Sequence, residues 1–134
     1  MIVTQSEIRS LNNEHDIVTA RQHVRKLCQT LKFTLVDQTK MVTAASELAR
    51  NTVIYGGGGR MHAELVQDGL RNGLRLQFVD EGPGIADLNL ALTDGWTSGS
   101  GLGMGLSGTR RLVNEFDIVS APGAGTRVII VHWV

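Results

Sequence analysis

The sequence predicts an α+β two-layer sandwich, in which three helices cover one face of a mixed, mostly antiparallel sheet. Helical periodicity occurs in two long stretches near the N-terminus and one short stretch after residue 105. The segments that alternate with period two follow one another in hairpins rather than in βαβ repeats, which favours helices gathered on one face of a sheet. Because 134 residues are typical of one domain, we expect a single domain over residues 1–134.

The N-terminal half predicts an edge strand over residues 2–11, followed by two helices. The first helix follows Asp16, which is a good N-cap residue. The second begins near Thr34, whose spacing to Asp37 resembles a capping box, and stops at the glycine run 56–59. The apolar residues of the first helix form one stripe: Ile17, Ala20, Val24, Leu27, Cys28 and Leu31. We therefore interpret Cys28 as a buried hydrophobic residue rather than a nucleophile.

The C-terminal half predicts four strands and one helix. Residues 61–65 and 74–78 alternate with period two, so we expect two antiparallel strands joined by a turn over 68–73. A third helix is expected over residues 106–116. Two closing strands then follow over residues 117–120 and 126–134, around the turn 121–125.

Composition excludes several classes of protein. The 13 basic residues balance the 13 acidic ones, so the chain lacks the basic surface of a nucleic-acid-binding protein. A single cysteine, Cys28, supports neither a disulfide framework nor a cysteine-based zinc site. No apolar run reaches about 18 residues, and the N-terminus lacks the features of a signal peptide. We expect a cytoplasmic protein that binds neither nucleic acid nor membranes.

Residues 76–109 have an unusual composition, with eight glycines and no lysine or arginine. Dense glycine allows the backbone to approach a ligand closely or to move. The alternative is a flexible surface loop. Four short clusters inside and around this window are candidates for a site.

Glu47 and Asn51 form the first cluster, because a spacing of four places them on one helix face. A carboxylate beside a carboxamide can bind a hydrated magnesium ion and hold a proton, although a solvated helix face is the ordinary alternative. The second cluster is Asp80 with Gly82 and Gly84 at the end of a strand. It can receive the amino group of a flat ligand, or it can be a plain turn.

The third cluster is the glycine-rich stretch 99–106, which opens the third predicted helix. A helix N-terminus of this kind attracts anions such as phosphate. It lacks the lysine of a P-loop, and no strand directly precedes it as in a dinucleotide fingerprint. The fourth cluster, Gly125-Thr126, indicates only the end of a hairpin when it is taken alone.

Taken together, these clusters follow the order Glu-x-x-x-Asn, Asp-x-Gly-x-Gly, Gly-x-Gly-x-Gly and Gly-Thr. This order resembles the GHKL superfamily, whose ATP-binding (Bergerat) fold is shared by gyrase, Hsp90, histidine kinases and MutL. More narrowly, residues 46–51, 80–85 and 94–106 are similar to the serine/threonine switch kinases and anti-sigma factors of bacterial partner-switching pathways, which include the stressosome. The resemblance spans essentially the whole chain.

The resemblance implies a role for individual residues. Glu47 would be the catalytic base, Asn51 would ligate Mg²⁺, and Asp80 would accept from the amino group of adenine with the help of Thr126. Residues 85–100 would form a lid over the nucleotide. The implied ATP-binding residues are Asn51, Asp80, Gly82, Gly84, Ile85, Gly101, Gly103, Met104, Gly105 and Thr126.

The function that the resemblance implies is an ATP- and Mg²⁺-dependent kinase, which phosphorylates a serine or threonine of a STAS-domain partner. When released, it would also activate a PP2C-type phosphatase by binding. The alternatives are an anti-sigma factor that sequesters a sigma subunit, and a nucleotide-dependent binding module without transfer; the presence of Glu47 argues against the latter. Because residues 76–109 hold no cation, we expect slow, partner-dependent transfer unless Arg50, Arg110 or a partner's arginine reaches the phosphates.

Overall fold

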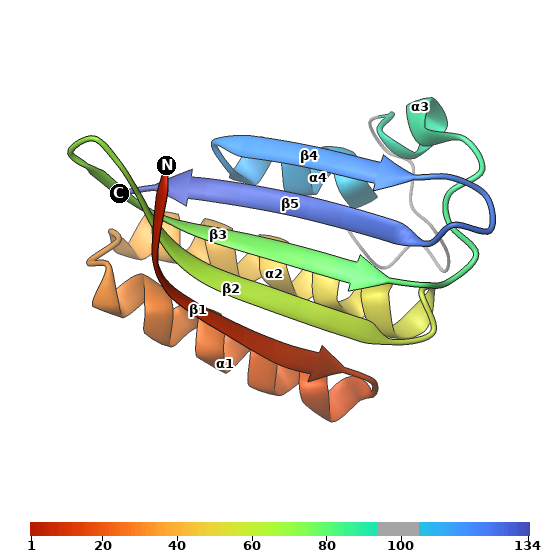
Figure 1. Cartoon of the computed structure of the whole chain (residues 1–134), viewed down its shortest axis with the longest axis horizontal. Helices are drawn as coiled ribbons and strands as arrows, with labels where there is room; N and C mark the ends of the chain where they lie inside the picture. The colour runs from red at the N-terminus through yellow and green to blue at the C-terminus, as the bar shows by residue number, and fades with distance from the viewer. Residues whose placement is uncertain (94–104) are drawn as a thin grey trace.

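The computed structural model describes residues 1–93 and 105–134, so the predicted residues Gly101, Gly103 and Met104 and the lid segment 94–100 lie outside the described residues. Three helices lie on one face of a five-stranded sheet, and the fourth, short helix lies at one end (Figure 1). The elements in chain order are β1 (Ile2–Leu11), α1 (Glu14–Thr30), α2 (Leu35–Ile54), β2 (Gly59–Asp68), β3 (Arg71–Asp80), α3 (Leu88–Ala91), α4 (Gly105–Leu112), β4 (Glu115–Ser120) and β5 (Thr126–Trp133). The predicted α+β class is confirmed.

The strand order is β1-β2-β3-β5-β4, which confirms β1 as an edge strand. All four pairings in the described part of the chain are antiparallel, so the sheet is not mixed as predicted. Hairpins join β2 to β3 and β4 to β5, and the segment containing α3 and α4 connects β3 to β4, which runs in the same direction as β3 on the far side of β5. Pairing of β3 with β5 sets Asp80 directly opposite Thr126, although the two are far apart in sequence.

Side-chain capping sets where the two long helices begin. Helix α1 is capped by Asn13 rather than by Asp16 as predicted, because Asn13 Oδ1 accepts from the Asp16 backbone N–H at 2.9 Å. The Asp16 carboxylate lies inside the first turn and accepts from the backbone N–H of Asn12 at 2.8 Å. Helix α2 is capped as predicted, with Thr34 Oγ1 accepting from the Asp37 backbone N–H at 3.1 Å.

Two predicted boundaries are wrong by several residues. The turn between β2 and β3 is only residues 69–70, because the ladder continues to the Asp68–Arg71 pair. Helix α4 ends at Leu112 and β4 begins at Glu115, whereas the sequence predicted a helix that continues to residue 116. Strand β5 decides this boundary: Asn114 Oδ1 accepts from the Trp133 backbone N–H at 2.8 Å, and Glu115 pairs with Val131.

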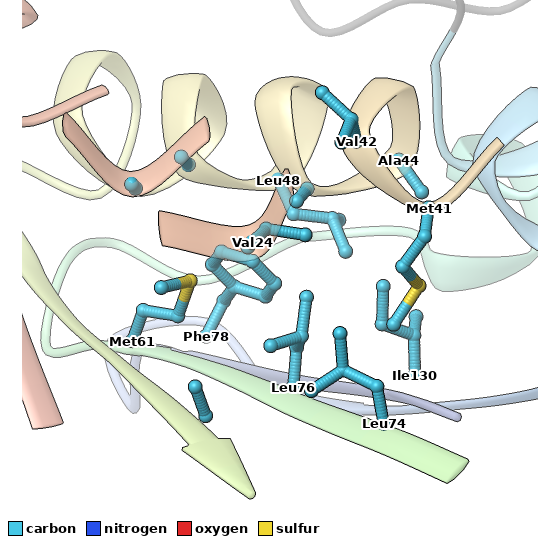
Figure 2. Packing of buried hydrophobic residues seen from close by; sticks show 14 of the residues in the cluster. Val24, Met41, Val42, Ala44, Leu48, Met61, Leu74, Leu76, Phe78 and Ile130 are labelled. Carbon is cyan, nitrogen blue, oxygen red and sulfur yellow. The ribbon is translucent and has the colours of Figure 1, made fainter. Parts of the chain in front are cut away.

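The main core lies between the helices and the sheet (Figure 2). Val24 of α1 and Leu48 of α2 point toward Phe78 and Leu76 of β3. Cys28 is fully buried in this core, and burial raises the pKa of its thiol to about 12. The thiol therefore stays protonated, which confirms its interpretation as a hydrophobic residue. Across the described residues, none of the helices is both long and apolar enough to cross a membrane.

Candidate functional site

A pocket of about 580 Å³, its open mouth included, lies where the C-terminal half of α2 meets the end of β3 and the start of β5. Most of its wall is apolar, and a few polar side chains interrupt it, which is the composition of small-molecule sites. The lining residues are Leu48, Asn51, Thr52, Tyr55, Gly56, Phe78, Asp80, Gly84, Ile85, Leu106, Thr126 and Val128.

Asp80, the last residue of β3, contributes the carboxylate of the pocket wall. Its Oδ1 accepts from the backbone N–H of Gly82 at 2.9 Å. Burial raises the pKa of Asp80, and the backbone amides of Gly82 and Thr126 oppose that rise. Among the described residues no cation pairs with this carboxylate. Asp80 therefore presents a hydrogen-bond acceptor to an apolar cavity, where an amino group is a suitable donor.

Glycines allow the surrounding loops to close tightly on Asp80. A Cβ atom at Gly56 would collide with the Asp80 carboxyl group, and one at Gly82 would lie 2.6 Å from the carbonyl oxygen of Gly56. Gly84 has a φ of 74° and packs against the carbonyl of Ala121. The sequence analysis treated Gly56 only as part of a helix stop, so its position beside Asp80 was missed. The signal available in the sequence was the run of four glycines, because one glycine is enough to end a helix.

Glu47 and Asn51 lie one turn apart on α2, as predicted, and both are half-buried. Asn51 lines the pocket, whereas Glu47 lies one turn further from the end of the helix and is absent from the pocket wall. Neither side chain forms a hydrogen bond or ion pair with any residue that the structure describes. Within the described part of the chain, both polar groups are therefore unpaired.

The described residues can also be compared with the ligands that a metal ion at this site would need. No group of three histidine, cysteine, aspartate or glutamate side chains gathers within residues 1–93 and 105–134. Mg²⁺, however, commonly uses one or two protein oxygens and completes its shell with water and substrate phosphates. The Asn51 carboxamide, unpaired in the described structure and facing the pocket, fits such an ion bound together with a phosphorylated ligand.

Ser120 at the end of β4 joins two sides of the pocket. Its hydroxyl lies 2.8 Å from Thr126 Oγ1 and accepts from the backbone N–H of Ile85 at 2.9 Å. Thr126 and Ile85, which the sequence analysis assigned to nucleotide binding, both line the pocket. The sequence analysis did not find Ser120. Gly105 begins α4, and the next residue, Leu106, reaches the pocket wall.

Comparison with known proteins agrees with this geometry. The family model described as histidine kinase-, DNA gyrase B-, and HSP90-like ATPase matches residues 36–133, a range that holds the pocket and both α2 residues. Serine/threonine-protein kinase RsbT of Bacillus subtilis (strain 168) is 42% identical over 130 residues, which is 97% of each chain. An anti-sigma F factor of Thermoanaerobacter sp. (strain X514) is 25% identical over 132 residues, covering 96% of this chain and 92% of the relative.

A solved structure has the same fold. The crystal structure of the RsbU and RsbW domains of a Mycobacterium tuberculosis protein superimposes with a TM-score of 0.68 at 22% identity. The superposition covers 96% of this chain and 32% of the solved one. The described pocket and helices therefore belong to an architecture shared well beyond relatives of high sequence identity.

Proposed function

Because the chain belongs to the histidine kinase-, DNA gyrase B- and HSP90-like ATPase family, we propose that it is an ATP- and Mg²⁺-dependent serine/threonine kinase acting on a STAS-domain protein in a bacterial partner-switching pathway. One observation carries the proposal: an apolar pocket with Asp80 in its wall lies beside an α2 face that holds Asn51 and, one turn away, Glu47. The 42% identical relative is itself a serine/threonine-protein kinase.

The pocket wall would hold the adenine ring. Asp80 accepts a hydrogen bond from the exocyclic amino group, and Thr126 lies opposite Asp80 in the neighbouring strand. Leu48 and Ile85 supply apolar surface for the ring. The close packing of Gly82 and Gly84 keeps the Asp80 loop in place.

The phosphates would extend from the pocket toward Asn51 and the start of α4. Asn51 would ligate Mg²⁺, and the ion would neutralise negative charge on the phosphates. Leu106, the second residue of α4, lines the pocket, so the N-terminal end of α4 would offer backbone N–H groups and the positive end of the helix dipole to the phosphates. We extend this phosphate site to Gly101, Gly103 and Met104, on the basis of the sequence pattern.

Glu47 would act on the acceptor. Its carboxylate takes the proton of the incoming serine or threonine hydroxyl while the hydroxyl oxygen bonds to the γ-phosphorus; the bond to the bridging oxygen breaks and ADP leaves. No lysine or arginine lines the pocket, so little positive charge from its described wall stabilises the transferred group. Slow transfer that depends on the partner follows from this, and it suits a regulatory switch.

The partner would be a STAS-domain protein that offers the phosphorylated serine or threonine. The kinase freed from it would bind and activate a PP2C-type phosphatase. The relative with the higher identity is a kinase and the one at 25% is an anti-sigma factor, so we place kinase activity before sequestration of a sigma subunit.

The test is transfer of labelled γ-phosphate from ATP, with Mg²⁺ present, to STAS proteins encoded near this gene. We expect label on a serine or threonine of one of them. Glu47→Ala should lower the rate by roughly 10²- to 10⁴-fold, because a proton acceptor is lost, and should leave ATP affinity largely unchanged. Glu14→Ala, in the exposed first turn of α1, serves as the control and should transfer normally.

Other outcomes would contradict the proposal. A Glu47→Ala protein that transfers phosphate at the normal rate removes the catalytic role of Glu47. Binding to a sigma subunit without transfer to any STAS protein indicates an anti-sigma factor. Nucleotide binding with neither transfer nor a sigma partner indicates a binding module.

A further inference from the structure

The Ser120 hydroxyl has more polar neighbours than any role described so far requires. It donates to the Gly125 carbonyl at 2.9 Å, accepts from the Ile85 backbone N–H at 2.9 Å, and lies 2.8 Å from Thr126 Oγ1. Ser120 itself is absent from the pocket wall, whereas Ile85 and Thr126 are both part of it. Ser120 can therefore act on a bound ligand only through these neighbours.

By distance alone either oxygen could be the donor in the contact between Ser120 and Thr126, and counting hydrogens assigns a direction to it. A hydroxyl group has one hydrogen and two lone pairs. The carbonyl of Gly125 can only accept, so it takes the Ser120 hydrogen. With that hydrogen on the Gly125 carbonyl, Ser120 Oγ has no second one to give, so the 2.8 Å contact is satisfied when Thr126 donates its own hydrogen.

This direction decides what Thr126 offers to the pocket. Its hydrogen is engaged by Ser120, so Thr126 Oγ1 presents only lone pairs to a ligand. Asp80, which pairs with Thr126 across β3 and β5, is an acceptor as well when it is ionised. When the C6 substituent of a purine faces these two neighbouring acceptors, an amino group there is favoured and a carbonyl oxygen is disfavoured.

We propose that Ser120 is a positioning residue that sets base specificity, by holding the Thr126 hydroxyl as an acceptor and so favouring a purine with an amino group at C6 over one with a carbonyl there. The inference rests on the proposed function, because it assumes that a purine nucleotide occupies this pocket. It adds a residue outside the pocket wall that selects adenine against guanine.

A purely structural role for Ser120 would have a different signature. Loss of the bond to Ile85 would loosen one wall of the pocket and weaken every nucleotide to a similar degree. Loss of the bond to Thr126 frees the Thr126 hydrogen, which can then turn toward a carbonyl oxygen on the base. The ratio of the adenine and guanine nucleotide affinities separates these two effects.

The experiment measures dissociation constants of ADP and GDP with Mg²⁺ by calorimetry, for the unmodified protein and for Ser120→Ala and Ser120→Thr. We expect Ser120→Ala to reduce the preference for ADP over GDP by about tenfold, the worth of one neutral hydrogen bond. Ser120→Thr keeps the hydroxyl and should keep the preference. Ser10→Ala, an exposed serine on β1, is the matched control and should change nothing.

A double-mutant cycle with Thr126→Val tests whether Ser120 acts through Thr126. Thr126→Val should itself lower the preference for ADP, and adding Ser120→Ala should not lower it further. If Thr126→Val leaves the ratio unchanged, the inference is overturned even if Ser120→Ala fails to fold. Equal weakening of ADP and GDP in Ser120→Ala also overturns it. An unmodified protein that binds neither nucleotide contradicts the proposed function instead.

Discussion

Asp80 combines a proposed role in nucleotide binding with a cost to the stability of the folded protein. Burial raises its pKa above the ordinary value of 3.8, against the opposing effect of the Gly82 and Thr126 amides. The ionised form is therefore less favourable in the folded than in the unfolded chain. Stability is lost as the pH rises from the ordinary value through the raised one.

Asp80→Asn should consequently raise the melting temperature of the nucleotide-free protein at pH 7, because it removes the buried charge. The same change should strongly weaken ATP binding, since an amide cannot match the charge-assisted bond of a carboxylate. Thermal melts and calorimetry on one preparation test both parts. Unchanged ATP affinity in the folded variant would refute the assignment of Asp80 to adenine.

Glu64 lies on the sheet face away from the helices, and its contribution to stability changes with pH in the opposite direction to that of Asp80. Arg75 donates to both of its oxygens, at 2.9 and 3.2 Å, and Gln77 donates to Oε1 at 2.9 Å. These hydrogen bonds, that of Arg75 first, hold the pKa of Glu64 below its ordinary value. The stabilisation is present above the ordinary value of 4.5 and is lost as the pH falls through the lowered pKa.

Glu64→Gln should therefore cost about 1 kcal/mol of unfolding free energy at pH 7. The difference from the unmodified protein should shrink below pH 4.5, where the carboxylate becomes protonated too. Urea denaturation at several pH values measures this. Asp68→Asn removes one partner of an exposed pair, with Arg71 at 3.0 Å, and is the control expected to show little change. A pH-independent loss in Glu64→Gln would contradict the electrostatic explanation.

At the scale of elements, the glycine run after α2 both ends a helix and makes room for the Asp80 loop. Gly56→Ala should leave α2 intact, because Gly56 is not among the glycines of positive φ, but its new Cβ atom must displace the Asp80 carboxyl group. Overpacking of this kind typically costs 1–3 kcal/mol. We therefore expect ATP affinity to fall on the order of tenfold or more, measured by calorimetry.

Gly69→Ala provides the comparison for that prediction. Gly69 has a φ of 63° and open space around it, in the turn between β2 and β3. Alanine there should cost roughly 1–2 kcal/mol of stability through backbone strain without any change in ATP affinity. Equal affinities for the two variants would show that Gly56 does not position Asp80.

At the scale of the whole molecule, ligand binding should stabilise the fold by mass action. ATP with Mg²⁺ at about 100 times its dissociation constant adds about 2.7 kcal/mol to the free energy of unfolding. Asn51→Ala should lose most of this increment, because the proposed Mg²⁺ ligand is gone, whereas Glu47→Ala should retain it. Thermal melts with ATP and Mg²⁺, repeated with EDTA, test the difference. An Asn51→Ala protein that is stabilised normally would refute the Mg²⁺ assignment.

The sequence by itself determined the local elements, because helix caps, glycine stops and alternation act over a few residues. The cap at Thr34 and the helix stop at the glycine run after α2 were both predicted from such signals. The same locality explains the errors. Asn13 and Asp16 are both competent caps by type, and only the folded chain shows which of them precedes the first turn.

Tertiary structure alone decided how the site is assembled. Pairing of β3 with β5 sets Thr126 opposite Asp80, packing places Gly56 against the Asp80 carboxyl group, and the end of β4 brings Ser120 to Thr126 and Ile85. No local pattern encodes these contacts, because each depends on which strands become neighbours across the sheet. The motif residues were readable from the chain, whereas the residues that orient them were not, since they act through hydrogen bonds and close packing that exist only in the folded protein.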